Sequence, residues 1–428
     1  MEGIASWGEQ ALLALARLLV NPLYYIGLLI IVLQYRRQIR LERKLFHTRL
    51  HSLLGESWRT ILWGWLGGLA ASVLMLGFGF SMSFDAVLLL WGIALLLMLI
   101  RIRYACLAYS AGVAGCLFTI AAAFPETQHW AGVGWIFQTA AGIHIPSLLM
   151  LVAVLHLIEG LLVRSQGARL ATPLFLRGKR GKIVGAYFLQ GMWAVPLFLL
   201  VPASSGGLML PWTPFWLESS STGWTFIAFP ALIGFTSYTL GHLPSEKSRQ
   251  ASGMLFIYAV TAAVLAITSF YWPILTLVAA LICFLLHEWL IVAANRAEEE
   301  KKPLYVSDGE GLKILAVLPR SPAAEMGIQA GETIKRVNQR PVQTRAEFHQ
   351  AMQLNPAYCK LEVMNRDGHV KFINKAVFAD QHHQLGILLC PDEEAPFFVA
   401  HEAKGFLSLF RRKPDRVLSS GDAPELKT

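Results

Sequence analysis

Long apolar segments separated by short polar loops fill the chain up to about residue 295. A helix that crosses a bilayer needs about 20 mostly apolar residues, because lipid offers no partners for backbone N–H and C=O groups. We therefore expect a polytopic α-helical membrane bundle with eight or nine transmembrane helices. The count is open because the third segment is short and Asn21-Pro22 interrupts the first. The predicted spans are residues 15–35, 60–80, 86–100, 104–124, 146–163, 183–201, 224–240, 251–270 and 273–293.

The second span carries small residues on one face. Gly64, Gly68 and Ser72 follow one another at intervals of four residues. Such a small-xxx-small face allows another backbone to approach closely. Packing of this face within the bundle and packing in a dimer are both compatible with the pattern, and we expect the first.

After a charged connector at 296–302, the pattern changes to short strands, helices and turns. Alternating residues predict a strand over 312–318, and Ser321-Pro322 opens a short helix that ends at Gly327. A second strand ends at Val337, before a turn. Thr344 and Glu347 form a capping box for a helix that reaches about Leu354. Strands over 361–364 and 370–373 are joined by an Asp367-Gly368 hairpin turn. We expect three parts: a multi-span transmembrane domain (1–295), a small α+β domain (303–391) and a flexible basic tail (392–428).

The order of elements in the α+β domain resembles a bacterial PDZ domain. The matching motifs are Ser321-Pro322-Ala323, Gly327-Ile328, Gly331-Glu332 and Asn338-Gln339, with Glu332 and Gln339 standing where the family usually has Asp and Gly. PDZ domains bind a C-terminal carboxylate with a Gly-Leu-Gly-Phe-like loop, and the next strand pairs with the ligand. The match here lies at the end of the domain, which implies a permuted strand order. The expected peptide groove comprises Leu385, Gly386, Ile387, Leu388, Leu389, Phe348 and Met352, although Phe348 and Met352 could equally be core residues.

Composition and charge support a membrane protein with its basic loops in the cytoplasm. Hydrophobic residues make up 55% of the 428 residues and charged residues only 15%, whereas soluble domains carry about 25%. Lys and Arg occur in four connections and are absent from the four that alternate with them, which predicts orientation by the positive-inside rule. The connector and the α+β domain then lie in the cytoplasm. The net charge of +9 follows from these loops and gives no reason to expect nucleic-acid binding.

No complete catalytic or metal-binding motif is found. Five cysteines form no CxxC pair, so we expect buried thiols and neither disulfides nor a metal site. Membrane metalloproteases need His-Glu-x-x-His, and His287-Glu288 lacks the second His. His156 and Glu159 share a helix face but supply two ligands at most. Because Glu159 and Glu288 stand shortly before Arg164 and Arg296, we expect both near the cytoplasmic surface. The sequence predicts no enzyme and no cofactor.

The tail contains one amphipathic candidate. Residues 406–413 combine aromatic and aliphatic residues with three successive basic ones, and could lie on anionic headgroups. A disordered tail is the alternative that we favour.

The whole architecture resembles the MinJ family, membrane proteins of division-site selection in Gram-positive rods. The resemblance is carried by residues 21–25, by the juxtamembrane segment 40–49 and by a single PDZ domain after the last helix. It implies a non-catalytic scaffold that connects a DivIVA-like polar protein to a MinD-like division inhibitor, enriched at septum and poles. A possible homo-oligomer is compatible with it. The alternative class is a membrane protease or transporter that a PDZ domain regulates.

Overall fold

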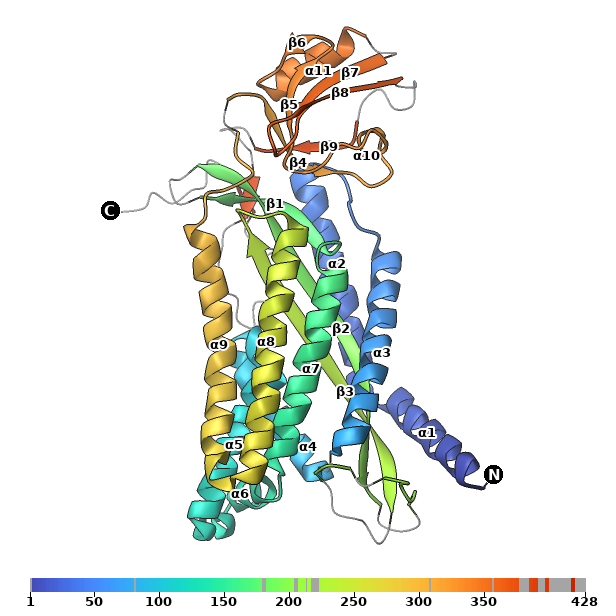
Figure 1. Ribbon diagram of the computed structural model, residues 1–428, viewed down its shortest axis with the longest axis vertical. Helices are drawn as coiled ribbons and strands as arrows, with labels where there is room; N and C mark the ends of the chain where they lie inside the picture. The colour runs from blue at the N-terminus through green and yellow to red at the C-terminus, as the bar shows by residue number, and fades with distance from the viewer. Residues whose placement is uncertain are drawn as a thin grey trace, which may run out of the picture.

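Long helices run side by side and a small β-sheet domain caps one end of them in the computed structural model (Figure 1). Residues 1, 81, 179–181, 204–206, 213, 217–222, 308, 356–357, 377–384, 392–396, 400–416 and 420–428 lie outside what the structure describes. Among the described residues, four helices are long and apolar enough to cross a membrane: α3 (Leu53–Phe78), α7 (Ile145–Gln166), α8 (Pro244–Tyr271) and α9 (Thr276–Glu300). Helices α4 (Phe84–Ile100) and α5 (Leu107–Ala123) are apolar but shorter, and α6 (Gly134–Ala141) is shorter still.

The first predicted span is a bent pair of helices. Helix α1 (Glu2–Val20) and helix α2 (Pro22–Phe46) meet at an angle of 58°. Asn21 caps α2, since its side chain accepts from the backbone N–H of Leu23 at 3.0 Å. Pro22 suits the first position of a helix, where no N–H is needed, and prevents α1 from continuing without a break. The pair can count as one span, so the described part of the chain holds up to five.

Two predicted spans are wrong: residues 183–201 and 224–240 form strands. They belong to β2 (Ile183–Pro202) and β3 (Trp224–Thr239), which pair antiparallel from Tyr187↔Thr239 to Pro202↔Trp224. The composition explains the difference. Pro196 and Pro230 would each remove a hydrogen bond from a helix interior, whereas here they face each other across the ladder. The remaining residues are rich in aromatic and branched side chains, which favour strands.

A hairpin in place of two spanning helices does not change the end of the molecule at which each neighbouring loop lies. Because β3 returns to the end from which β2 started, the segments on either side of the hairpin lie at one end, beside the sheet domain, as spanning helices would have placed them. Strand β1 (Ala171–Arg177) pairs with β2 there, and the sheet order is β11-β10-β1-β2-β3. The tail contributes β10 (Phe397–Val399) and β11 (Val417–Ser419), so these residues are not the flexible tail that we expected. The amphipathic candidate at 406–413 lies outside the described residues.

Helix α3 packs directly on the edge of β2. A Cβ at Gly64 would lie 2.2 Å from the carbonyl oxygen of Ala194, and one at Gly68 would lie 2.2 Å from that of Pro196. One turn further, Ser72 accepts the backbone N–H of Phe198 through its Oγ at 2.8 Å. The small-residue face therefore packs within the chain, as predicted, but its partner is a strand and not a helix.

The C-terminal domain has the predicted local elements. A five-strand order β8-β7-β5-β4-β9 is built from β4 (Leu312–Val317), β5 (Thr333–Val337), β7 (Tyr358–Met364), β8 (Val370–Ala376) and β9 (Ile387–Leu389), with β6 (Arg340–Pro341) beside β5. The helices are α10 (Pro322–Glu325) and α11 (Arg345–Gln353). The capping box of Thr344 and Glu347 is confirmed, and Gly368 takes a φ of 86° in the hairpin turn.

The C-terminal domain is docked onto β1 and the adjoining part of β2. The hydroxyl of Tyr187 donates to the carbonyl oxygen of Leu315 at 2.5 Å, and the N–H of Gly185 donates to that of Tyr305 at 2.8 Å. Arg366 makes two hydrogen bonds of 3.0 Å to the carboxylate of Glu246 at the start of α8. An apolar cluster that includes Phe175, Leu189 and Leu315 fills the interface.

We predict that Gly68→Val destabilises the membrane domain, because its side chain would collide with the backbone of β2. Overpacking of this kind destabilises by about 1–3 kcal/mol or more. The matched control is Gly77→Val, since Gly77 lies on the same helix and a Cβ there meets nothing within 4 Å. Thermal unfolding of the detergent-purified chains would measure the difference. Equal melting temperatures for the two variants would contradict the contact between α3 and β2.

Candidate functional sites

The expected peptide groove lies at one edge of the C-terminal sheet. Strand β9 pairs with β4 through Val317↔Ile387 and Ala316↔Leu388. It stands last in the strand order, so its outer edge carries no strand among the described residues. A free edge of this kind can accept a peptide as an additional strand. The backbone before it is also held, because Leu318 N–H donates to the carbonyl oxygen of Gly386 at 2.7 Å and Ala323 N–H to that of Leu385 at 2.9 Å.

The side chains expected in the groove divide between three places. Leu385, Leu389 and Phe348 are buried in the domain core, and Ile387 and Met352 pack at its margin. Leu388 points the other way, into the interface with β1 and β2. For Phe348 the structure favours the core alternative, since 8% of the residue is exposed. Ile387 on β9 and Met352 on α11 are thus half-buried apolar residues of the expected set that pack on the same core.

Gly386 has a conformational role. Its φ of 79° lies in the left-handed region, and a Cβ there would lie 2.2 Å from the Cβ of Ser321. A substitution such as Gly386→Val would therefore disturb the folding of the domain as well as any peptide contact. It cannot separate binding from stability, so a test of the groove needs another residue.

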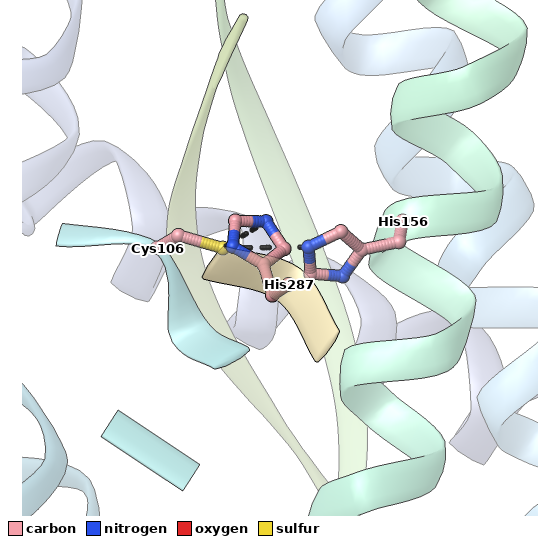
Figure 2. A group of neighbouring side chains, drawn as sticks. All are labelled: Cys106, His156 and His287. Atoms are coloured by element: carbon pink, nitrogen blue, oxygen red, sulfur yellow. Dashed lines mark hydrogen bonds between the residues drawn. The ribbon is translucent and has the colours of Figure 1, made fainter. Parts of the chain in front are cut away.

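A cluster of polar side chains lies inside the helix bundle. The Sγ of Cys106, at the start of α5, is 3.4 Å from Nε2 of His156 on α7 and 3.8 Å from Nε2 of His287 on α9 (Figure 2). His156 and His287 are buried and Cys106 is half-buried. The sequence pattern placed the two histidines in separate candidate motifs and predicted only a buried thiol at Cys106. No local signal joins them, because Cys106 stands 50 residues from one and 181 from the other.

The neighbouring carboxylates are held in ways that the sequence did not indicate. Glu288 forms an ion pair with Arg103, from the turn between α4 and α5, and accepts the hydroxyl of Tyr109 at 2.7 Å. Its carboxylate is therefore neutralised by Arg103 while about a quarter of its side chain stays exposed. Glu159 is buried, with Oε2 4.0 Å from Nε2 of His156. The helix face shared by His156 and Glu159 was visible in the sequence, whereas the partners of Glu288 were not.

A cavity of about 320 Å³ lies between the membrane domain and the C-terminal domain. Its lining combines the loop after α2 with β1 and the C-terminal domain, and includes Leu50, His51, Arg169, Tyr187, Ile328 and Gln329. His51 is fixed in this wall. Its Nδ1 lies 2.5 Å from Oε1 of Glu42, and its Nε2 lies 3.1 Å from the carbonyl oxygen of Arg169.

Both ring nitrogens of His51 face acceptors, which favours the doubly protonated ring. Burial disfavours the charge, but the hydrogen bond and charge of Glu42 outweigh it, so the pKa of His51 is raised above 6.5. Proton binding to a group with a raised folded-state pKa stabilises the fold. This contribution is complete below pH 6.5 and is lost as the pH rises through the folded-state pKa.

We predict that the melting temperature of the purified chain falls as the pH is raised from 6 to 9, and that His51→Gln removes part of this fall. Glutamine keeps hydrogen-bonding capacity without a titratable proton, so the difference between the two curves isolates His51. Differential scanning fluorimetry in detergent measures both. Parallel curves would contradict the assignment of a charged His51.

Curated relatives are similar to this chain over most of its length. No family model matches it. The chain is 28% identical over 400 residues to the cell division topological determinant MinJ of Bacillus subtilis (strain 168), which covers 92% of this chain and 98% of the relative. It is 26% identical over 264 residues to a probable cell division topological determinant MinJ of Lacticaseibacillus paracasei, covering 59% of this chain and 68% of the relative.

Among solved structures, the PDZ domain of the SdrC-like protein of Listeria monocytogenes is similar to part of the chain. The identity is 16% and the TM-score 0.17, with 19% of this chain and 87% of that domain covered.

Proposed function

Because the chain belongs to the MinJ family, we propose that it is a non-catalytic membrane scaffold in division-site selection. The observation that carries the proposal is the similarity to a cell division topological determinant over 92% of the chain, membrane and C-terminal domains included. A scaffold needs a fixed place in the membrane and surfaces for partners. The docked C-terminal domain and the basic loops beside it provide such surfaces at one end of the molecule.

The proposed side for these surfaces is the cytoplasm. The basic connections between α2 and α3, between α7 and β2, and at the start of α8 lie at the same end as the C-terminal domain, because the β2–β3 hairpin returns to the end from which it starts. Positive residues remain on the cytoplasmic side of a membrane protein. The connections without Lys or Arg, including the segment between α5 and α7, then face outward.

We predict that Ala131→Cys is labelled by a membrane-impermeant thiol reagent in intact cells, whereas Ala168→Cys is labelled only in opened membranes. Both alanines are exposed, and they lie in loops at opposite ends of α7. The unaltered chain, with its five cysteines, is the background control. Labelling of Ala168→Cys in intact cells would overturn the orientation.

The proposed partner site is the edge of β9 beside α11. A partner's C-terminal peptide would pair with this strand, with its carboxylate near the backbone of Leu385 and Gly386. The half-buried Ile387 and Met352 offer an apolar surface for its terminal side chain. By resemblance to the family, the partners would be cytoplasmic division proteins, DivIVA-like and MinD-like. The scaffold would then concentrate at septum and poles.

We predict that Ile387→Thr lowers the capture of these partners by about tenfold, as truncation of a central contact does. The change keeps a branched side chain suited to a strand but replaces a methyl-bearing arm with a hydroxyl. The matched control is Val370→Thr on β8, the opposite edge of the sheet. Each variant replaces the native chain in its own host, tagged for imaging and for pull-down of the two partners.

The unaltered chain and Val370→Thr should concentrate at septa and poles, and Ile387→Thr should spread over the membrane. An even membrane signal from the unaltered chain, with normal septum placement, would contradict the scaffold itself. Full capture by a folded Ile387→Thr chain would leave the scaffold standing but move the binding surface elsewhere, to the basic loops first.

A further inference from the structure

Three ligand-type atoms from three separate helices converge at one point inside the membrane domain (Figure 2). The Sγ of Cys106 and one ring nitrogen each from His156 and His287 all lie within 4.8 Å of one another. The two imidazoles point toward the sulfur from α7 and α9. Thiolate and imidazole are the ligands that zinc prefers among side chains.

The spacing fits one ion. Zinc binds sulfur at about 2.3 Å and imidazole nitrogen at about 2.0–2.1 Å, and tetrahedral angles then separate S from N by about 3.5 Å. The observed Cys106 Sγ to Nε2 distances are 3.4 Å for His156 and 3.8 Å for His287.

His156 is oriented as a metal ligand is. Nδ1 of His156 lies 2.7 Å from the carbonyl oxygen of Val152, which can only accept, so Nδ1 carries the proton and Nε2 presents its lone pair to the cluster. Tyr258 packs against both imidazoles, with ring centroids 4.6 Å and 5.2 Å away. His287 turns Nε2 toward Sγ of Cys106, and its buried Nδ1 finds no hydrogen-bond partner in the described structure.

The surrounding charge also fits a cation. A divalent ion with one thiolate leaves a net charge of +1, and the buried carboxylate of Glu159 beside His156 would balance it. Glu288 is not available for this role, since Arg103 already neutralises it. Neutral overall charge matters here because an uncompensated charge is unfavourable inside a membrane bundle.

We propose that Cys106, His156 and His287 bind a zinc ion within the membrane domain, with Glu159 as the balancing carboxylate. The ion joins the start of α5 to α7 and α9. It thereby fixes the α4–α5 pair, whose helices have only 17 residues each, against the long helices.

The test uses the full-length chain purified in detergent without metal-chelating resins. Elemental analysis should find about one zinc per chain, the stoichiometry of a single site. Replacement by Co²⁺ should produce a sulfur-to-cobalt charge-transfer band in the near ultraviolet. Cys106→Ser should lose the band and most of the metal. Cys116→Ser, on the same helix, and Cys283→Ser, on α9, should keep both, because neither thiol belongs to the cluster.

A second measurement does not depend on any variant folding. Alkylation of the unaltered chain, read by mass spectrometry, should be slower at Cys106 with metal than after chelation, with Cys116 as the internal reference. Zinc well below one per chain after reconstitution, with no cobalt band, would overturn the proposal. The proposal would also be overturned if Cys106→Ser kept all of its metal and if metal did not slow the alkylation of Cys106 in the unaltered chain. The division scaffold would stand in either case, because it rests on other residues.

Discussion

The membrane domain depends on how β2 satisfies its backbone beside α3. A strand edge inside a bilayer is unfavourable, because N–H and C=O groups there find no water. Pro196 and Pro230 face each other in the ladder, and neither has an N–H to donate. Their pair is therefore a non-hydrogen-bonded one, and in an antiparallel ladder such pairs recur at every second residue. The backbone groups of residues 194, 196 and 198 must then point away from β3, toward α3.

Three of these outward groups meet α3. The carbonyl oxygens of Ala194 and Pro196 lie over Gly64 and Gly68, which leave room for them because a Cβ at either glycine would come within 2.2 Å. The N–H of Phe198 donates to Oγ of Ser72, and Pro196, the outward-facing residue before it, has no N–H to donate. On the other side, α1 covers β3, where Arg17 donates to the carbonyl oxygen of Phe226 at 3.3 Å. The hairpin is stable among helices because both edges are covered.

The same strand connects the membrane domain to the C-terminal domain. At about 3.3 Å per residue, β2 extends for roughly 60 Å, about twice the hydrocarbon thickness of a bilayer. Phe198 contacts α3 near one end, and Gly185 and Tyr187 hold the C-terminal domain near the other. The continuous strand therefore holds the C-terminal domain in one orientation relative to the membrane domain.

The sequence predicted what local signals determine. The capping box at Thr344 and the turn at Gly368 depend on neighbouring residues, and both appear as expected. Residues 183–201 were mistaken for a helix because a continuous apolar run has the same hydropathy in either conformation. Pro196 and Pro230 were the available warning. The close-contact face of α3 was read correctly, but its partner lies 130 residues away in sequence at Ala194, and the cluster around Cys106 is equally non-local. Only tertiary structure brings such groups together.

Disulfide formation across β2 and β3 tests the central claim most directly. Phe198 and Ala228 are register partners two residues from the proline pair, so they form a non-hydrogen-bonded pair with Cα atoms about 4.5 Å apart. The account predicts that the double variant Phe198→Cys with Ala228→Cys cross-links in native membranes under mild oxidation. Phe198→Cys with Leu232→Cys, displaced along β3 by about 13 Å, should not cross-link. Cross-linking of the second pair but not the first would contradict the hairpin, and with it the role of α3 as its cover.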